Sequence, residues 1–166
     1  SGEEVIAMSI LLHELGIEDK VLIVATDLDH DMIAKARIAT YPMKSMDVNE
    51  KNYQLFSESS AGLDHYYERH GSKVVFNPDL LKPITFRRHD LVTGEVFGKF
   101  DLIFCRNVMI YFNQALQNHV LMKFHESLLP NGYLCVGSKE SLIWCDYANR
   151  FQIENNDEKI YRKITE

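Results

Sequence analysis

Polar residues that could hold a ligand follow a predicted buried strand within residues 100–112. The first half of this stretch, Phe-Asp-Leu-Ile-Phe-Cys, predicts the strand, and Arg106, Asn107 and Tyr111 lie within six residues of its end. In an open α/β sheet, ligands bind beyond the carboxyl ends of the strands. The alternative is that Tyr111 and Phe112 are core aromatic residues, which we expect for Phe112. The Arg-Asn pair favours a binding site over a plain turn.

An aspartate ends an earlier apolar run in the same way. Residues 21–26 predict a strand that is buried on both faces, and Asp27 follows it directly. In dinucleotide-type folds, an acidic residue at the end of the second strand accepts hydrogen bonds from ribose hydroxyls. The alternative role is a helix cap, for which Asp29 is better placed. We therefore expect Asp27 to bind a ribose.

Two glutamates open the first expected helix. A helix N-terminus attracts anions, but Glu3 and Glu4 would repel a phosphate and would suit a ligand with an ammonium or sulfonium group. The alternative is that they only complement the helix dipole, with Ser1 and Glu4 forming a capping box. For the two glutamates taken alone, this alternative is preferred. Together with Asp27, they give more support to the binding role.

Two further loops are weaker candidates. Asp90 can bind an adenine amino group while Leu91 packs on the ring, although Asp90 would serve equally as the cap of a turn before Thr93 and Gly94. Residues 137–141 end another strand, where they either line the substrate side of a cleft or form a polar loop without a function.

Strands that alternate with helices are expected to position these residues. Helices are predicted at 3–15, ending at Gly16, and at 30–39, 46–56 and 113–129; strands are predicted at 21–26, 65–69, 73–76, 84–88, 100–105, 133–137, 149–154 and 158–164, with a turn at 130–132. The alternation predicts one α/β domain over 1–166, with a mostly parallel sheet, helices on both faces and antiparallel C-terminal edge strands. Residues 43–82 interrupt the alternation and are expected to contain a small inserted β-subdomain.

The composition excludes several classes of function. The chain has 166 residues and a net charge of -6, so nucleic acid is not an expected partner. Its three cysteines lack C-x-x-C spacing and its histidines lack metal-ligand spacing, so we expect no disulfide and no metal site. No apolar run approaches the length of a membrane span, and reduced cysteines favour a cytoplasmic protein that is not embedded in a membrane.

Taken together, these motifs resemble the catalytic domain of the chemotaxis receptor methyltransferases of the CheR type. The most specific match is Phe-Cys-Arg-Asn-Val-x-Ile-Tyr-Phe at 104–112. Further matches follow in the family order at 2–4, 25–29, 75–76, 84–91, 130–134 and 137–141. The resemblance covers essentially the whole chain and implies a Rossmann-like fold that uses S-adenosylmethionine.

The resemblance also implies an activity and a set of site residues. It implies methylation of glutamate side chains on the cytoplasmic part of chemoreceptors, with S-adenosylhomocysteine as the product. It assigns cofactor contacts to Glu4, Asp27, Asp90, Leu91, Arg106 and Asn107. It places Tyr111 close to the methyl-transfer centre, with Arg106 as the second catalytic candidate, and it implies that the insertion at 43–82 docks receptor tails in some members.

The chain also departs from the family pattern. Family members carry an N-terminal helical domain and a first central strand, neither of which is recognisable here, so we expect a fragment of a longer protein. Val5 and Ile6 replace the usual Pro-Tyr, and Lys139 lies within the Gly-Ser-x-Glu loop. Two other functions remain open: a non-catalytic module that binds the cofactor or a partner, and, less favoured, a methyltransferase of the same fold that acts on a small molecule.

Overall fold

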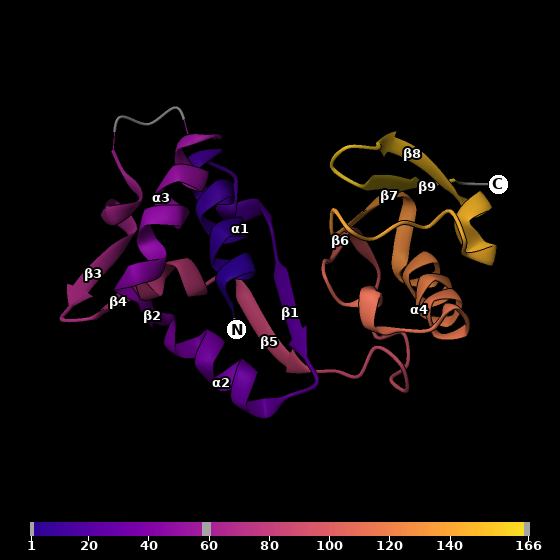
Figure 1. The fold of residues 1–166 in the computed structure, drawn as a ribbon, viewed down its shortest axis with the longest axis horizontal. Helices are drawn as coiled ribbons and strands as arrows, with labels where there is room; N and C mark the ends of the chain where they lie inside the picture. Colours follow the sequence, from indigo (N-terminus) through magenta and orange to yellow (C-terminus); the bar gives the residue numbers. More distant parts are fainter. Residues whose placement is uncertain (1, 58–60, 165–166) are drawn as a thin grey trace. The chain divides into compact units, whose positions relative to one another are not determined.

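A computed structural model describes residues 2–57 and 61–164 of the chain. The chain forms two compact units, Ser1–His89 and Asp90–Glu166 (Figure 1). Each unit encloses its own cluster of buried apolar side chains.

A pair of parallel strands lies in the first unit. β1 (Ile23–Asp27) pairs with β5 (Ile84–Arg88), and the register places Asp27 opposite Arg88. The backbone N–H of His89 continues the ladder by donating to the carbonyl of Asp27 at 3.0 Å. Both strands therefore end at the same edge, and Asp27 lies at that edge.

The first unit also contains two helices, which precede and follow β1 in the sequence. α1 (Glu3–Glu14) ends in a Schellman motif, in which the N–H of Gly16 bonds the carbonyl of His13 and the next N–H bonds that of Leu12. Gly16 has a φ of 64°, so the predicted glycine stop is confirmed. α2 (His30–Ile38) follows β1.

Caps are predicted for the beginnings of both helices. Asp29 caps α2 by accepting a hydrogen bond from the N–H of Asp31 at 2.8 Å, as predicted. At α1 the N-cap is Gly2, with a φ of 98°, and the predicted capping box of Ser1 with Glu4 stays a prediction. Ser1 lies outside the described residues.

A three-stranded antiparallel sheet lies between β1 and β5 in the sequence. The order is β2 (Thr40–Pro42), β4 (Lys73–Phe76) and β3 (Tyr67–His70), with α3 (Met46–Gln54) before β3. The β3–β4 hairpin is the predicted one, whereas β2 was not expected. The identity of 43–82 as an inserted subdomain stays a prediction.

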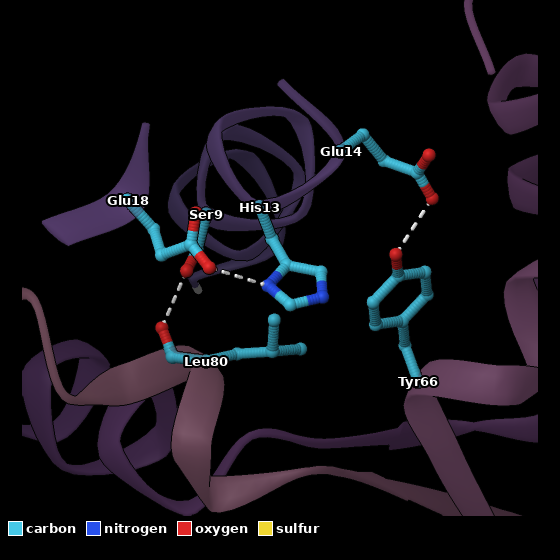
Figure 2. Close-up of polar contacts among 6 residues, drawn as sticks. All are labelled: Ser9, His13, Glu14, Glu18, Tyr66 and Leu80. Carbon is cyan, nitrogen blue, oxygen red and sulfur yellow. Dashed lines mark hydrogen bonds and ion pairs between the residues drawn. The ribbon is translucent and has the colours of Figure 1, made fainter. Parts of the chain in front are cut away.

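Figure 2 shows how α1 is attached to the rest of the first unit. The buried hydroxyl of Ser9 donates to the carbonyl of Leu80 at 2.6 Å. The carboxylate of Glu14 accepts hydrogen bonds from Tyr66 at 2.6 Å and from Tyr53 of α3 at 2.5 Å. His13 and Glu18 form a further hydrogen bond at 2.9 Å. These contacts fix the helix that carries Glu3 and Glu4 at its start.

The second unit contains a four-stranded sheet. Its order is β6 (Phe100–Cys105), β7 (Leu128–Val136), β9 (Ile160–Lys163) and β8 (Phe151–Asn155). β6 and β7 are parallel, and the remaining neighbours are antiparallel, as predicted for the C-terminal strands.

A long helix, α4 (Gln114–Ser127), connects β6 to β7. Asn113 caps it, as predicted, by accepting a hydrogen bond from the N–H of Leu116 at 3.0 Å. Val120, Leu121 and Phe124 on α4 are buried in the core of this unit. Short 3-10 helices occur at Glu18–Lys20, Met43–Ser45, Leu63–Tyr66, Pro78–Leu81, Met109–Tyr111 and Asp146–Arg150.

The α/β class predicted from the sequence is confirmed. The turn predicted at 130–132 is wrong as an element boundary, because β7 runs through it. Its backbone is nevertheless irregular: Asn131 has a φ of 61°, and the β6–β7 register shifts at this place. The prediction of a single domain over 1–166 stays a prediction.

Candidate functional site

Asp27 has a carboxylate that is only partly engaged. The side chain is half-buried, and its Oδ1 accepts the N–H of Asp29 at 2.9 Å. Among the described residues, none donates a hydrogen bond to its Oδ2. Arg88 ties the following loop to β5 by donating from Nε to the carbonyl of Leu28 at 3.0 Å. An anchored carboxylate with an unused oxygen can accept hydroxyl donors such as those of a ribose.

The start of α1 is closely packed against neighbouring elements. A Cβ at Gly2 would lie 2.7 Å from the Cβ of Ala36 and 2.8 Å from the hydroxyl of Tyr41. Burial, with a smaller effect from the carboxylate of Glu3, raises the pKa of Tyr41. The side chain of Glu4 is exposed in the first turn of the helix. The backbone here is thus fixed while the acidic side chain can reach a ligand.

In the second unit, the loop at 90–94 is a tightly bonded turn. Asp90 accepts the N–H of Val92 at 2.8 Å and the hydroxyl of Thr93 at 2.7 Å. The turn-capping alternative is therefore present in the structure. The role of Asp90 in binding an adenine amino group stays a prediction. Leu91 is half-buried and packs against the core of the unit.

Side chains of α4 hold this turn in place. The ammonium of Lys123 donates to the carbonyls of Leu91, Val92 and Gly94 at 3.3, 2.6 and 2.6 Å. A ring nitrogen of His119 lies 3.1 Å from the carbonyl of Val92. The position of the 90–94 turn is thus set by side chains one helical turn apart on α4.

The loop after β6 carries the Arg-Asn pair. Arg106 and Asn107 are exposed, and Asn107 has a φ of 59°. Tyr111 is 81% exposed, so the core-aromatic alternative for it is wrong, whereas Phe112 is half-buried and packs on the core as expected. Gln117 of α4 supports the same loop by donating to the carbonyls of Met109 and Phe112 at 2.9 and 3.2 Å.

A buried carboxylate from the neighbouring strand end organises this loop. Glu140 is only 4% exposed, and its oxygens accept the backbone N–H groups of Gly137, Asn107, Val108 and Ile110. From the sequence, Glu140 is only one member of a polar loop, and Lys123 is an ordinary helix residue. The Gly-x-x-Glu spacing directly after a strand was the available signal for Glu140.

Asp27 and Glu4 lie in the first unit, and Asp90, Leu91, Arg106, Asn107 and Tyr111 lie in the second. Within the second unit, α4 supports both ligand-candidate loops. Whether each of these residues contacts a cofactor or takes part in catalysis stays a prediction.

An apolar hollow of about 130 Å³ lies in the first unit beside α1 and α3, but its lining includes none of the predicted cofactor residues. In the described part of the chain, no group of histidine, cysteine or acidic residues could hold a metal ion. None of the three cysteines forms a disulfide bond in the structure. The helices of the described residues are too short or too polar to cross a membrane.

An α/β fold with polar loops after its parallel strands is typical of domains that bind nucleotide-type cofactors. The sequence matches the family described as "CheR methyltransferase, SAM binding domain" over residues 1–160. The chain belongs to this family, and its cofactor is S-adenosylmethionine.

Curated relatives agree with the family match. The chain is 39% identical over 163 residues to "Putative methyltransferase Cher3" of Pseudomonas putida, covering 98% of this chain and 59% of the relative. It is 32% identical to "Chemotaxis protein methyltransferase 1" of Pseudomonas aeruginosa and 34% identical to the "Chemotaxis protein methyltransferase" of Listeria innocua, covering 86% of this chain in both cases and 52% and 51% of those relatives. The chain thus spans about half to three fifths of their length.

One solved structure shows a weaker likeness. The N-methyltransferase NodS from Bradyrhizobium japonicum aligns over 87% of this chain and 74% of its own, with 13% identity and a TM-score of 0.47. This similarity is too low to support an argument about function.

The residues present fit the chemistry of the cofactor. Asp27 offers an acceptor for ribose hydroxyls, and the apolar side chain of Leu91 beside Asp90 offers a surface for a purine. Glu4 offers negative charge for the ammonium or sulfonium group. When bound, S-adenosylmethionine supplies an electrophilic methyl group on a positively charged sulfur.

Proposed function

We propose that the full-length protein is a protein-glutamate O-methyltransferase that modifies chemoreceptors. The observation that carries this proposal is the loop at 106–111, which is rigidly bonded through its backbone while Arg106 and Tyr111 remain exposed. This arrangement suits a site that orients a ligand and a carboxylate. The family match and the names of the chemotaxis relatives support the same activity.

The cofactor contacts are proposed as the family resemblance assigns them. Asp27 accepts the ribose hydroxyls, Asp90 and Leu91 bind the adenine, and Glu4 faces the positively charged end. Arg106 and Asn107 complete the cofactor site. This assignment follows from the family resemblance, and the hydrogen-bond geometry of Asp27 is consistent with it.

The chemistry requires orientation more than proton transfer. A glutamate carboxylate is already ionised at neutral pH, so no general base is needed. Arg106 can attract and align the substrate carboxylate, and the exposed hydroxyl of Tyr111 can donate a hydrogen bond close to the transferred methyl group. Positioning of this kind contributes about 7–11 kcal/mol in favourable cases. Because the reaction neutralises opposite charges, exclusion of water from the site favours it.

The three-stranded sheet is proposed to dock a receptor tail. β3 (Tyr67–His70) pairs with β4, and among the described strands none pairs with its other side. Extended peptides bind such edges by adding a strand. Loss of methylation rate on removal of the tail from a receptor fragment would support this docking, and an unchanged rate would exclude it for that receptor.

Cofactor binding is tested by calorimetry with S-adenosylhomocysteine on the full-length gene product. Asp27→Ala removes hydrogen bonds to a charged acceptor, each of which contributes about 1.5–3 kcal/mol, so we expect the affinity to fall at least tenfold. The matched control is Asp31→Ala, an exposed carboxylate on α2. Equal affinity in wild type and Asp27→Ala would refute the ribose role.

Methyl transfer is tested with labelled S-adenosylmethionine and the cytoplasmic fragment of a chemoreceptor. Labelling that is released by mild base, and that disappears when the accepting glutamates are changed to glutamine, is the expected result. Binding of the cofactor without any transfer would favour the non-catalytic module. Transfer to a small molecule but not to the receptor would favour the third alternative.

A further inference from the structure

Glu140 is a buried carboxylate whose acceptor positions are filled by backbone donors. Its Oε2 accepts the N–H groups of Gly137 at 2.6 Å and Asn107 at 2.9 Å. Its Oε1 accepts those of Val108 at 2.9 Å and Ile110 at 3.3 Å. Burial of a charge is costly unless hydrogen bonds compensate it. The two donors on each oxygen provide that compensation.

Three of the four donors belong to the loop that carries the site residues, about thirty positions earlier in the chain. Successive N–H groups that point to one anion form a concave backbone nest. The Glu140 carboxylate occupies this nest. Arg106 directly precedes the first of these N–H donors, and Tyr111 directly follows the last one. The directions of both side chains therefore depend on the conformation of the nest.

Asn107 gives independent support for this dependence. Its φ of 59° lies in the left-handed region, which is unfavourable for a residue with a side chain, although less so for asparagine. The bond from its N–H to Glu140 holds this conformation. A Cβ at Gly137 would lie 2.4 Å from the Asn107 Oδ1 and 2.8 Å from the Glu140 Oε2. Gly137 thus lies close to both Asn107 and the Glu140 carboxylate.

We propose that Glu140 is a positioning residue that fixes residues 106–111 so that Arg106, Asn107 and Tyr111 are oriented for S-adenosylmethionine and substrate. Its carboxylate acts as an internal anion and touches neither reactant. The proposal gives the Gly-Ser-Lys-Glu segment a physical role: Gly137 allows the close approach, and Glu140 supplies the charge. It rests on the proposed function for the reaction that the oriented residues serve.

The test uses the full-length gene product with Glu140→Ala and Glu140→Gln. Glutamine retains the shape but presents an amide donor to two backbone donors, and alanine empties the nest. We expect the affinity for S-adenosylhomocysteine to fall at least tenfold in both variants. Hydrogen exchange at Asn107, Val108 and Ile110 should accelerate, while exchange within α4 and β7 stays as in wild type. Glu158→Gln, at an exposed position of the same unit, is the matched control.

Chemical rescue separates positioning from a general loss of stability. In Glu140→Ala, formate or acetate can enter the nest and should restore at least part of the cofactor affinity, whereas chloride at equal ionic strength should restore less. If the Glu140 variants fail to fold, Gly137→Ala provides the second route, because its Cβ would clash with both Asn107 and the Glu140 carboxylate. The same loss of affinity and the same local increase in exchange are then expected.

The results that would overturn the positioning role differ from those that would overturn the proposed function. Cofactor affinity within twofold of wild type, or exchange that accelerates equally throughout the second unit, would overturn the positioning role. If wild type itself fails to bind S-adenosylhomocysteine, the proposed function falls. The exchange measurement at residues 107–110 needs no cofactor, so it still decides whether Glu140 sets the loop.

Discussion

Lys123 provides a prediction that can be worked out from its contacts. Its ammonium donates to three carbonyls of the 90–94 turn, two of them at 2.6 Å. The change Lys123→Met keeps most of the apolar stem on α4 and removes only the donor. Because the side chain is half-buried, water can replace part of the lost interaction at the carbonyls.

The expected magnitude follows from these contacts. Hydrogen bonds to a charged group contribute about 1.5–3 kcal/mol each, and rehydration of the carbonyls reduces the total, so we expect a loss of about 2 kcal/mol. For a protein of this size, 1 kcal/mol shifts Tm by about 2–4 °C, which gives a decrease of about 4–8 °C. The affinity for S-adenosylhomocysteine should fall about fivefold, because Asp90 and Leu91 lie on the released turn.

The assay combines thermal unfolding by circular dichroism with calorimetric titration of S-adenosylhomocysteine. Lys51→Met, the same chemical change at an exposed position of α3, is the control and should leave both values within error. A Tm within 1 °C of wild type together with an unchanged affinity would refute the anchoring role. A lower Tm with unchanged affinity would show that the turn is anchored but does not bind adenine.

Two further predictions concern stability. Hydrogen bonds from Tyr53 and then from Tyr66 lower the pKa of Glu14 below its ordinary value of 4.5. The contribution of Glu14 to folding stability is therefore present above that value and is lost as the pH falls through the folded-state pKa. Urea unfolding at pH 7 and pH 3.5 should show a smaller pH-dependent loss of stability in Glu14→Gln than in wild type, and an equal loss would contradict this. Leu121→Ala removes a fully buried side chain from the core of the second unit and should lower the free energy of unfolding by about 2–5 kcal/mol, measured with denaturant. The control Leu22→Ala changes a side chain that is 75% exposed and should cost far less. Similar losses in the two variants would contradict the assignment of the core.

The elements with strong local signals were predictable from the sequence. The apolar run before Asp27 and the helical spacing in 113–129 correspond to β1 and α4 within a few residues. β2 was missed because a three-residue strand that ends in Pro42 has little propensity of its own and forms by pairing with β4. The turn at 130–132 was misplaced because β6 pairs along both sides of the irregular backbone, which no local signal indicates.

The candidate site was predictable only in part. Residues at strand ends, such as Asp27 and Arg106, are visible because their position along the chain is informative. Glu140 and Lys123 are not, because their partners lie about thirty residues away and are backbone atoms, which carry no side-chain signature. Charged residues are usually exposed, so sequence reasoning assigns both to the surface.

The arrangement of supporting side chains along α4 has a consequence for variation among relatives. Gln117 supports the loop after β6, while His119 and Lys123 support the 90–94 turn. Insertion or deletion of one residue between Gln117 and Lys123 would rotate one set relative to the other by about 100°. The helix between Gln117 and Lys123 should therefore reject changes in length, since either loop would lose its support.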